Sequence, residues 1–223
     1  MEVELLKASD RLRGSLDSGL TWESEVTTIE DGESSTRKFK IRAAGVDANV
    51  EALEPARNKG EIYLFNDRTM WFFKPSLKKP VAISSRQKLS GQAAIGDIAS
   101  TNYARDYTPV IEKTETLNGE KVYVLMLQAK ANNLTYDKIR YWISDKSKRA
   151  IKAEFLTLQG LPFKKATLQY DNQITINGQK LDFVSRMEIV DAKYENNKSI
   201  LQYRNPVLEN HKKNLFQVNQ LKR

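Results

Sequence analysis

The feature that most limits the fold of this chain is a run of alternating segments separated by tight-turn signals. Asp31-Gly32, Asn118-Gly119 and Asn177-Gly178 each stand between two segments in which apolar and polar side chains tend to alternate. Such dipeptides favour the two-residue turns of β-hairpins, because Asn, Asp and Gly tolerate the positive φ angles of those turns. Segments 60–65 with 69–74, and 137–144 with 149–158, repeat the pattern. The sequence therefore predicts about ten or eleven strands in successive hairpins, as in an antiparallel meander, sandwich or barrel.

Three segments depart from this alternation. Apolar residues at helical spacing between positions 5 and 16 predict an amphipathic N-terminal helix. Residues 84–108 do not alternate, and we expect a short helix around Ile95 to Tyr103 within them. Asn205 followed by Pro206 predicts the start of a helix that runs through Leu215, because Asn suits the cap and Pro the first turn.

The composition is that of a globular protein with a substantial core. The chain has 223 residues, of which 40% are hydrophobic and 29% charged, and we find no linker, repeat or low-complexity run. We therefore expect a single domain over residues 1–223. The absence of cysteine excludes disulfides, thiol catalysis and cysteine metal sites. A formal net charge of +8 favours anionic partners such as nucleic acid, phospholipid headgroups or acidic proteins.

Several predicted strands are apolar on both faces. In the segment 122–127 one face carries Val122, Val124 and Met126, and the other carries Tyr123, Leu125 and Leu127. A sheet with one face in water would carry polar residues on that face. We therefore expect a helix, a loop, a partner or a ligand to cover the second face.

Residues 70–91 join an aromatic segment to a basic one. Positions 70–73 are Met, Trp, Phe and Phe, and residues 68–96 hold six basic residues and no acidic one. The aromatic side chains could fill an ordinary core or line a binding cavity. The lysines could belong to a solvated loop or to an electropositive rim that meets phosphate headgroups or an acidic docking surface. The residues alone leave both pairs of interpretations open.

The stretch from Lys59 to Tyr107, KGEIYLFNDRTMWFFKPSLKKPVAISSRQKLSGQAAIGDIASTNYARDY, resembles the outer-membrane lipoprotein-sorting (LolA-like) proteins of Gram-negative bacteria. The resemblance implies a mostly β (α+β) fold, in which a curved antiparallel incomplete β-barrel of about ten or eleven strands wraps around an N-terminal helix and short plug or lid helices. The best-known members of the family carry lipoprotein acyl chains through the periplasm. Relatives with this longer central motif look like accessory proteins of lipid or RND-type export systems.

The resemblance also implies candidate sites. We expect an apolar ligand cavity, a lid that plugs it, and a basic rim beside it. The cavity residues would be Ile62, Leu64, Trp71, Phe73, Val124 and Met126, the plug residues Ile95 and Ile98 with Gly91 and Gly96 as hinges, and the rim residues Lys78, Lys79 and Arg86. Asp97 would cap the short helix that follows it.

Two features of the family are absent here. The classical carrier has an arginine followed by proline in its third strand that is important for cargo release. The nearest match is Arg42, which no proline follows, so that role is not assigned to it. The membrane-anchored acceptor of the superfamily carries a lipidated N-terminal cysteine, and this chain has none. It is therefore similar to the soluble carrier type.

Catalysis has little support in the sequence. The single histidine, His211, lies in a polar stretch, and the acidic run EDGE at 30–33 lies where a hairpin turn is expected. No nucleophile elbow and no phosphate-binding glycine loop is present. We expect no enzymatic activity, no cofactor and no metal site.

We therefore expect a periplasmic carrier that buries lipid or lipoprotein acyl chains and delivers them towards the outer membrane. Its partners would be an inner-membrane donor or export complex, an outer-membrane acceptor, and the membrane surface in transient contact, but not nucleic acid. We expect a monomer whose signal peptide has been removed, because the first residues, MEVELLKASD, do not form one. Two alternatives remain open: an adaptor of an export system that carries no lipid, and a basic β protein that binds single-stranded nucleic acid.

Overall fold

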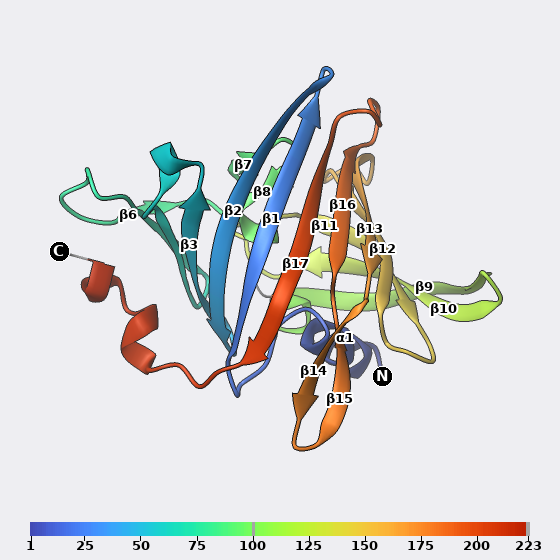
Figure 1. Cartoon of the computed structure of the whole chain (residues 1–223). Coiled ribbons are helices and arrows are strands. Elements are labelled where there is room, and N and C mark those ends of the chain that lie inside the picture. Colours follow the sequence, from blue (N-terminus) through green and yellow to red (C-terminus); the bar gives the residue numbers. More distant parts are fainter. Residues whose placement is uncertain (100, 222–223) are drawn as a thin grey trace.

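The computed structural model describes residues 1–99 and 101–221, which form a strongly curved antiparallel sheet with short helices packed against it (Figure 1). Within these residues the main sheet has thirteen strands and two small sheets have two strands each. In sheet order the main strands are β6 (Val81–Ile83), β5 (Thr69–Phe73), β4 (Ile62–Asn66), β3 (Asp47–Glu54), β2 (Glu33–Ala44), β1 (Leu20–Glu30), β17 (Lys198–Leu208), β16 (Arg186–Asp191), β13 (Pro162–Gln169), β12 (Ala150–Leu156), β11 (Lys138–Ser144), β10 (Glu120–Ala129) and β9 (Tyr107–Leu117). The sheet begins at β6 and ends at β9, so the barrel is not closed.

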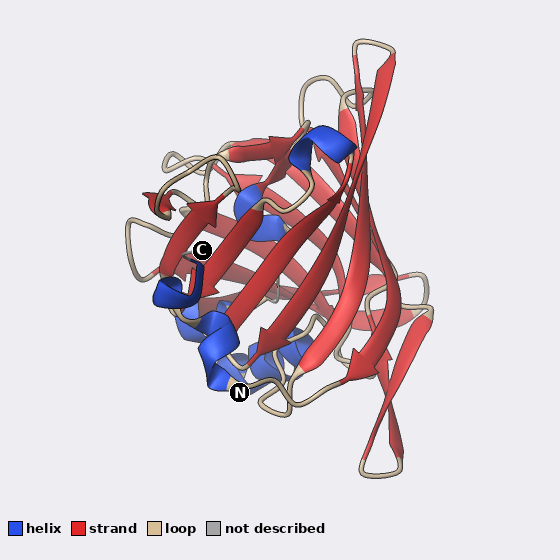
Figure 2. Cartoon of the chain, turned by 60° about the vertical axis from the view of Figure 1, so that its left-hand side comes forward, coloured by secondary structure: helices blue, strands red, loops and turns tan. Residues whose placement is uncertain are grey.

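The small sheets and the helices complete the molecule. The small sheets pair β14 (Asn172–Ile176) with β15 (Gln179–Phe183), and β7 (Lys88–Ser90) with β8 (Ala93–Ala94). The helices are α1 (Glu2–Arg11), α2 (Tyr103–Asp106) and the 3₁₀ turns η1 (Ala56–Asn58), η2 (Ile95–Asp97), η3 (Lys213–Phe216) and η4 (Val218–Leu221). Figure 2 shows the curvature of the sheet. None of the helices in the described residues is long and apolar enough to cross a membrane.

The predicted hairpins are confirmed at their turns. Asp31, Asn118 and Asn177 have φ angles of 51°, 52° and 50°, and each is followed by a glycine with positive φ. The predicted fold class, a curved incomplete barrel around an N-terminal helix, is also confirmed. The strands are more numerous than the ten or eleven expected. One reason is that the predicted hairpin around Asn177 is divided at residues 170–171 and 184–185, so that β14 and β15 leave the main sheet as a projecting pair.

Two predicted helices differ from the structure. Asn205 and Pro206 lie in β17 and do not begin a helix. They form a bulge opposite β1, where Asn205 takes a φ of 52°, and the pairing of β17 with β16 has already ended at Gln202. Proline is tolerated there because no neighbouring strand on that side requires its missing N–H. The helix expected over 95–103 is instead two short pieces, η2 and α2.

The sheet has an inner face, which contacts α1, and an outer face. The large core on the inner face joins residues of α1, such as Leu5 and Leu6, to strand residues including Tyr63, Leu125 and Leu127. At β4 and β5 the outer face is also covered, because η3 and η4 place Phe216 and Leu221 against Leu64 and Phe73. This explains why the strands of that hairpin are apolar on both faces.

Candidate functional site

The inner face is covered by α1 and by residues 84–99 and 101–106, which we call the covering segment. Its apolar side chains point into the core: Ile98 is fully buried, Ile95 is 5% exposed, and Leu89 and Ala99 join the same cluster. The apolar inner face is therefore filled by the chain itself in the described residues. The two predicted plug residues lie where a plug would have to lie, and their role towards a ligand stays a prediction.

The covering segment is attached to the central strands by hydrogen bonds. The buried Ser199 Oγ of β17 accepts from the backbone N–H of Gln92 at 2.9 Å and of Ala93 at 3.3 Å, and donates to the carbonyl oxygen of Ser90 at 2.9 Å. Thr28 of β1 lies 2.6 Å, oxygen to oxygen, from the Ser90 hydroxyl. Two polar side chains on the inner face thus hold the turn between β7 and β8.

Charged side chains hold the same segment further along the sheet. Lys164 Nζ of β13 donates to the Gln92 carbonyl at 2.7 Å, and Arg37 Nη1 of β2 donates to the Leu89 carbonyl at 3.0 Å. Burial lowers the pKa of the Lys164 ammonium, with the nearby Asp97 carboxyl acting in the opposite direction. The covering segment is therefore held by polar contacts along its edge and by apolar contacts with the core beneath it.

Asp97 is the buried acid of the covering segment. Its Oδ2 accepts from the Ala94 N–H at 2.8 Å and from the Tyr136 hydroxyl at 2.7 Å. Burial raises the pKa of this carboxyl. Asp97 therefore caps η2 from inside that turn, not the later helix that the sequence favoured.

The glycines expected to be hinges are sites of close approach. A Cβ atom on Gly91, whose φ is +53°, would lie 2.3 Å from Thr28 Cγ2 and 2.6 Å from Ser199 Oγ. A Cβ atom on Gly96 would lie 2.0 Å from Thr135 Oγ1. Glycine is required at both positions because the backbone passes directly against neighbouring side chains. Whether they also act as hinges stays a prediction.

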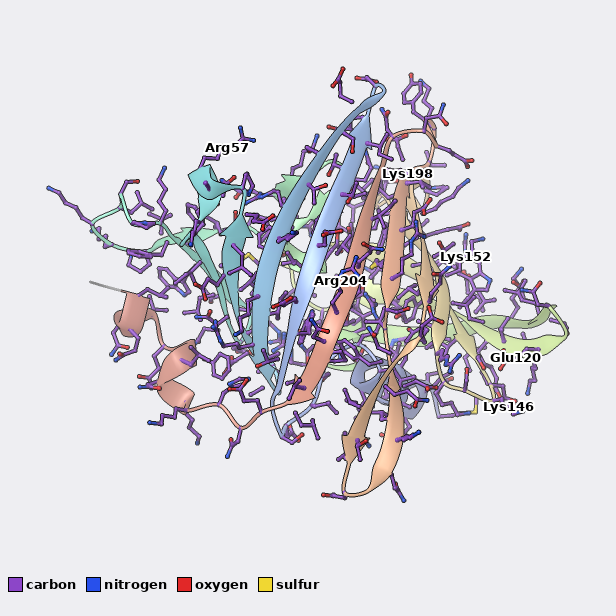
Figure 3. All side chains as sticks on the ribbon, in the orientation of Figure 1. Arg57, Glu120, Lys146, Lys152, Lys198 and Arg204 are labelled. Carbon is purple, nitrogen blue, oxygen red and sulfur yellow. The ribbon has the colours of Figure 1, made fainter. Side chains whose placement is uncertain are left out.

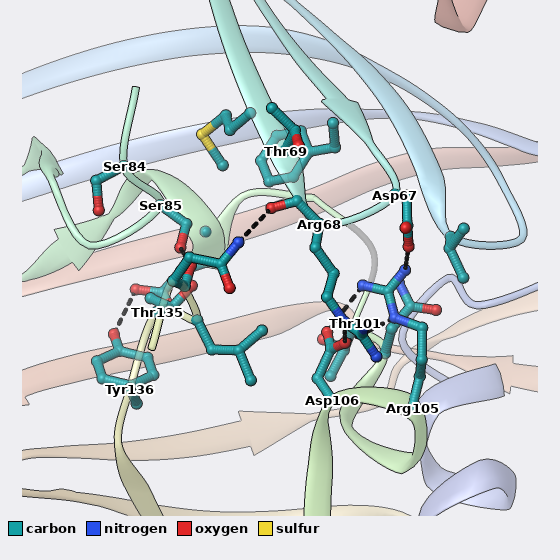
Figure 4. Close-up of a pocket in the computed structure, with 18 of the residues that line it drawn as sticks. Asp67, Arg68, Thr69, Ser84, Ser85, Thr101, Arg105, Asp106, Thr135 and Tyr136 are labelled. Atoms are coloured by element: carbon teal, nitrogen blue, oxygen red, sulfur yellow. Dashed lines mark hydrogen bonds and ion pairs between the residues drawn. The ribbon is translucent and has the colours of Figure 1, made fainter. Parts of the chain in front are cut away.

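A hollow of about 480 Å³ opens where the barrel would close. Its wall joins Ala82 and Ile83 of β6, at one edge of the main sheet, to Tyr107 of β9, at the other edge. The wall mixes apolar side chains with polar ones, among them three arginines, three aspartates and three tyrosines (Figure 4). It therefore differs from the purely apolar cavity that the sequence predicted.

We call the gap between the two edges of the main sheet, at β6 and β9, the seam, and ion pairs bridge it. Arg105 of α2 contacts Asp67 at 2.9 Å and Asp106 at 2.7 Å, and Arg68 reaches Asp106 at 3.3 Å, so the β4–β5 turn is tied to α2 (Figure 4). Arg86 makes two hydrogen bonds to the Asp137 carboxylate, at 2.6 and 3.0 Å. The arginine neighbour holds the pKa of Asp137 below its ordinary value.

A buried polar pair lies beneath the seam, next to α1. Arg13 is 5% exposed, and its Nη1 donates to the Tyr141 hydroxyl at 2.9 Å while its guanidinium lies 5.5 Å from the centre of the Tyr103 ring. Asp10 Oδ2 accepts from the Ala104 N–H at 2.8 Å. Burial raises the pKa of Asp10 to about 7. These contacts connect α1 to α2 and to β11.

The structure places the predicted cavity residues on the outer face. Ile62, Leu64, Trp71 and Phe73 pack with Phe216 and Leu221, and the apolar residues of this hairpin that line the hollow are Phe65 and Met70. Val124 packs with Val122 and Trp142, away from the inner core, and Met126 shares its face. The predicted set therefore lies on the opposite face from α1 and the covering segment. Alternation separates two faces but does not indicate which one is concave.

The predicted basic rim is divided in the structure. Lys78 and Lys79 are exposed in the loop between β5 and β6 and do not line the hollow. Arg86 is bound to Asp137 at the seam. Arg42 forms an ion pair of 3.1 Å with Glu51 on the neighbouring strand. Sequence reasoning missed Ser199, Thr28 and Lys164, whose signal was a polar residue at an inner-face position of a predicted strand.

The outer face of the central strands is charged, and its charges are paired. Lys152 contacts Glu154, Lys198 contacts Glu188 and Arg204 contacts Glu25, at 3.3, 3.2 and 3.7 Å. Figure 3 labels the three basic residues along these strands. Paired charges without exposed aromatic rings between them differ from a surface that stacks single-stranded bases. No group of three His, Asp or Glu residues suited to a metal ion occurs in residues 1–99 and 101–221.

Comparison with known proteins identifies relatives of this fold. The profile of a family described only as "Uncharacterized protein" matches residues 46–223. A LolA superfamily protein from Nitrosomonas europaea superimposes with a TM-score of 0.86 and is 28% identical, with 99% of each chain covered. The chain belongs to the matched family, and it is LolA-like.

Two further structures support the LolA-like fold. An outer membrane lipoprotein-sorting protein domain from Vibrio parahaemolyticus has a TM-score of 0.82 at 22% identity, covering 100% of this chain and 98% of that one. A DUF1329 family protein from Desulfovibrio piger has a TM-score of 0.80 at 19% identity, covering 99% and 97%. No curated protein sequence matches the chain. The name of the Vibrio relative refers to lipoprotein sorting.

Proposed function

We propose that this LolA-like protein is a periplasmic carrier that holds lipid or lipoprotein acyl chains between the inner face of its sheet and the covering segment. It would deliver them towards the outer membrane without performing any chemistry. The observation that carries the proposal is the large apolar core on the inner face beneath a segment that is attached by hydrogen bonds.

The energetics of exchange support this proposal. Acyl methylenes can replace the contacts of Leu89, Ile95 and Ile98 with the inner core, at about 0.8 kcal/mol for each buried methylene. The hydrogen bonds that hold the segment can be replaced by bonds to water, and each contributes only about 0.5–1.5 kcal/mol net. An acyl chain of ordinary length therefore offers enough free energy to displace the covering segment, and an acceptor with an equally apolar site can take the chain back.

The first test is whether the protein holds lipid. Organic extraction of the purified protein followed by lipid mass spectrometry should recover bound lipid, and the lipid-free protein should take up a fluorescent fatty acid. An adaptor without carrier activity would do neither. Absence of lipid in the extract together with absence of uptake would reject the proposal.

A disulfide can test the covering segment directly, because the chain has no cysteine that could mispair. A Cβ atom at position 96 lies 3.1 Å from the Cβ atom of Thr135, slightly inside the usual disulfide range of about 3.5–4.5 Å. We therefore expect Gly96→Cys with Thr135→Cys to join the segment to the β10–β11 connection after a small shift. The oxidised protein should not take up fatty acid, and reduction should restore uptake. The reduced form of the same variant is the matched control, and equal uptake by both forms would show that the segment does not gate the site.

A further inference from the structure

Exposed apolar side chains gather on two neighbouring turns at one end of the sheet. Leu158 and Leu161, in the turn between β12 and β13, are 62% and 66% exposed, and Phe163 follows them at 39%. Tyr194, in the turn between β16 and β17, is 58% exposed. We call these four residues the apolar tip. Clusters of this kind on a soluble surface mark contact sites.

The two turns are held together and are ordered. β13 pairs with β16, and the Ala192 N–H donates to the Phe163 carbonyl at 3.1 Å. Within the first turn the Thr157 N–H donates to the Leu161 carbonyl at 2.8 Å, and the Leu161 N–H donates to Thr157 Oγ1 at 3.2 Å. The leucines are therefore presented by a closed turn and not by a loose loop.

Lysines lie beside residues of the apolar tip. Lys138 Nζ donates to the Leu158 carbonyl at 2.9 Å, Lys193 Nζ lies 5.0 Å from the centre of the Tyr194 ring, and Lys164 Nζ lies 5.8 Å from that of Phe163. The residues 157–165 contain two lysines and no acidic residue. In the other turn Glu195 follows Tyr194 and forms an ion pair of 3.1 Å with Lys165. The apolar side chains of the β12–β13 turn, with lysines beside them, match the boundary between lipid headgroups and acyl chains, since lysine stems lie on apolar surface while the ammonium reaches phosphate.

An acidic turn lies on one side of the apolar tip and limits how the tip can face an anionic surface. The Asp31 N–H donates to Asn197 Oδ1 at 3.1 Å, so the turn between β1 and β2, with Glu30 and Glu33, lies beside the β16–β17 turn. An anionic surface would repel that turn. Contact is therefore centred on the β12–β13 turn, on the side away from the acidic residues.

We propose that the apolar tip docks on an anionic phospholipid bilayer, with Leu158, Leu161 and Phe163 entering the headgroup layer. Two projecting turns that expose four large side chains fit a fluid surface better than a protein partner, which needs a complementary patch of about 800 Å². Docking also positions the covering segment. Lys164 follows Phe163 directly and binds the Gln92 carbonyl, so docking brings the covering segment to the membrane surface.

Vesicle sedimentation with lipid-free protein tests docking separately from carriage. We expect the protein to sediment with vesicles of phosphatidylglycerol and phosphatidylethanolamine but weakly with phosphatidylcholine. Leu158→Ser with Leu161→Ser should lower the partition coefficient about tenfold or more. The control is Val110→Ser with Val207→Ser, because these valines are 59% and 57% exposed and lie elsewhere. Its partition should equal that of the wild type.

Uptake of a fluorescent fatty acid from solution should be unchanged in the tip variant, so loss of docking and loss of carriage are distinguishable. The proposal is overturned if the wild type ignores anionic vesicles, or if the tip variant binds them equally well. It is also overturned if sedimentation velocity shows a dimer that the tip substitutions dissociate, because the tip would then contact a second copy of the chain.

Discussion

Replacing Ser199 by alanine should loosen the covering segment without disturbing the rest of the fold. The Ser199 side chain is fully buried, and its hydroxyl makes two hydrogen bonds of 2.9 Å, to Gln92 and Ser90, and a longer one of 3.3 Å to Ala93. At about 0.5–1.5 kcal/mol net for each bond, the closed state loses about 2–3 kcal/mol. In the open state these backbone groups bind water with or without the Ser199 hydroxyl, so the substitution destabilises only the closed state. Opening should therefore become about 30–150 times more frequent.

Hydrogen exchange followed by mass spectrometry measures this change. Peptides that cover residues 88–94 should exchange faster in Ser199→Ala by that factor, while those of α1 and β10 should keep their rates. Ser34→Ala is the matched control, because Ser34 is an exposed serine of β2 that is paired with Ile29 and lies on the opposite face of the sheet from Thr28. If opening limits uptake, fatty acid should also enter the variant faster.

Two results would refute the reasoning. Unchanged exchange at residues 88–94 would mean that the Ser199 hydroxyl does not hold the covering segment. Equal acceleration in every peptide would mean that the segment opens only when the whole domain unfolds, and the polar attachment would then have no separate role.

Three further predictions concern Asp10, Phe73 and Gly96. Burial raises the pKa of Asp10 from 3.8 to about 7, so the folded protein binds a proton that the unfolded chain releases; this contribution to stability is complete below about pH 4 and is lost as the pH rises towards 7. Asp10→Asn should flatten that slope in urea unfolding across this range, and an unchanged slope would contradict it. Phe73→Ala should lower the free energy of unfolding by about 3 kcal/mol through its contact with Phe216, and fatty acid uptake should persist, whereas a Phe73 on the ligand side would abolish uptake. Gly96→Ala should cost about 1–3 kcal/mol in thermal unfolding, partly recovered with Thr135→Ala, because the nearest atom to the new Cβ is Thr135 Oγ1.

Hairpins and their turns could be predicted because they depend on local residues. The positive φ of Asp31, Asn118 and Asn177 follows from residue type, and alternation over a few positions identifies each strand. The N-terminal helix follows from its own periodicity in the same way. These parts of the fold need no knowledge of distant contacts.

The choice of face could not be predicted for strands that are apolar on both sides. Leu64 and Tyr63 are neighbours in β4, and both are buried, one under the C-terminal residues and one in the inner core. The direction in which the sheet curves, and the return of Phe216 to its outer face, decide between them. Both are properties of the whole chain, so the sequence could not show that these side chains lie on the outer face.

Tertiary pairing also overrode a local signal at Asn205 and Pro206. The dipeptide is typical of a helix start, but β17 lies between β1 and β16, and extending its ladder with β1 to Leu208 outweighs the preference of two residues. The bulge accommodates both, because Asn tolerates positive φ and the proline needs no partner there.

The polar side chains on the inner face affect how easily the turn between β7 and β8 can leave the core. Had Ser199, Thr28 and Lys164 been apolar, the turn between β7 and β8 would be held by contacts that water cannot replace, and opening it would expose that surface at full cost. Hydrogen bonds hold it in register but cost little to exchange for water. At the same time, Gly91 brings the backbone within reach of Ser199 and Thr28, which a larger residue would prevent. A permanent core would also need partners for the buried backbone groups of Ser90, Gln92 and Ala93, so the low cost of exchanging these bonds for water is what an opening segment requires, and hydrogen exchange in Ser199→Ala distinguishes the two cases.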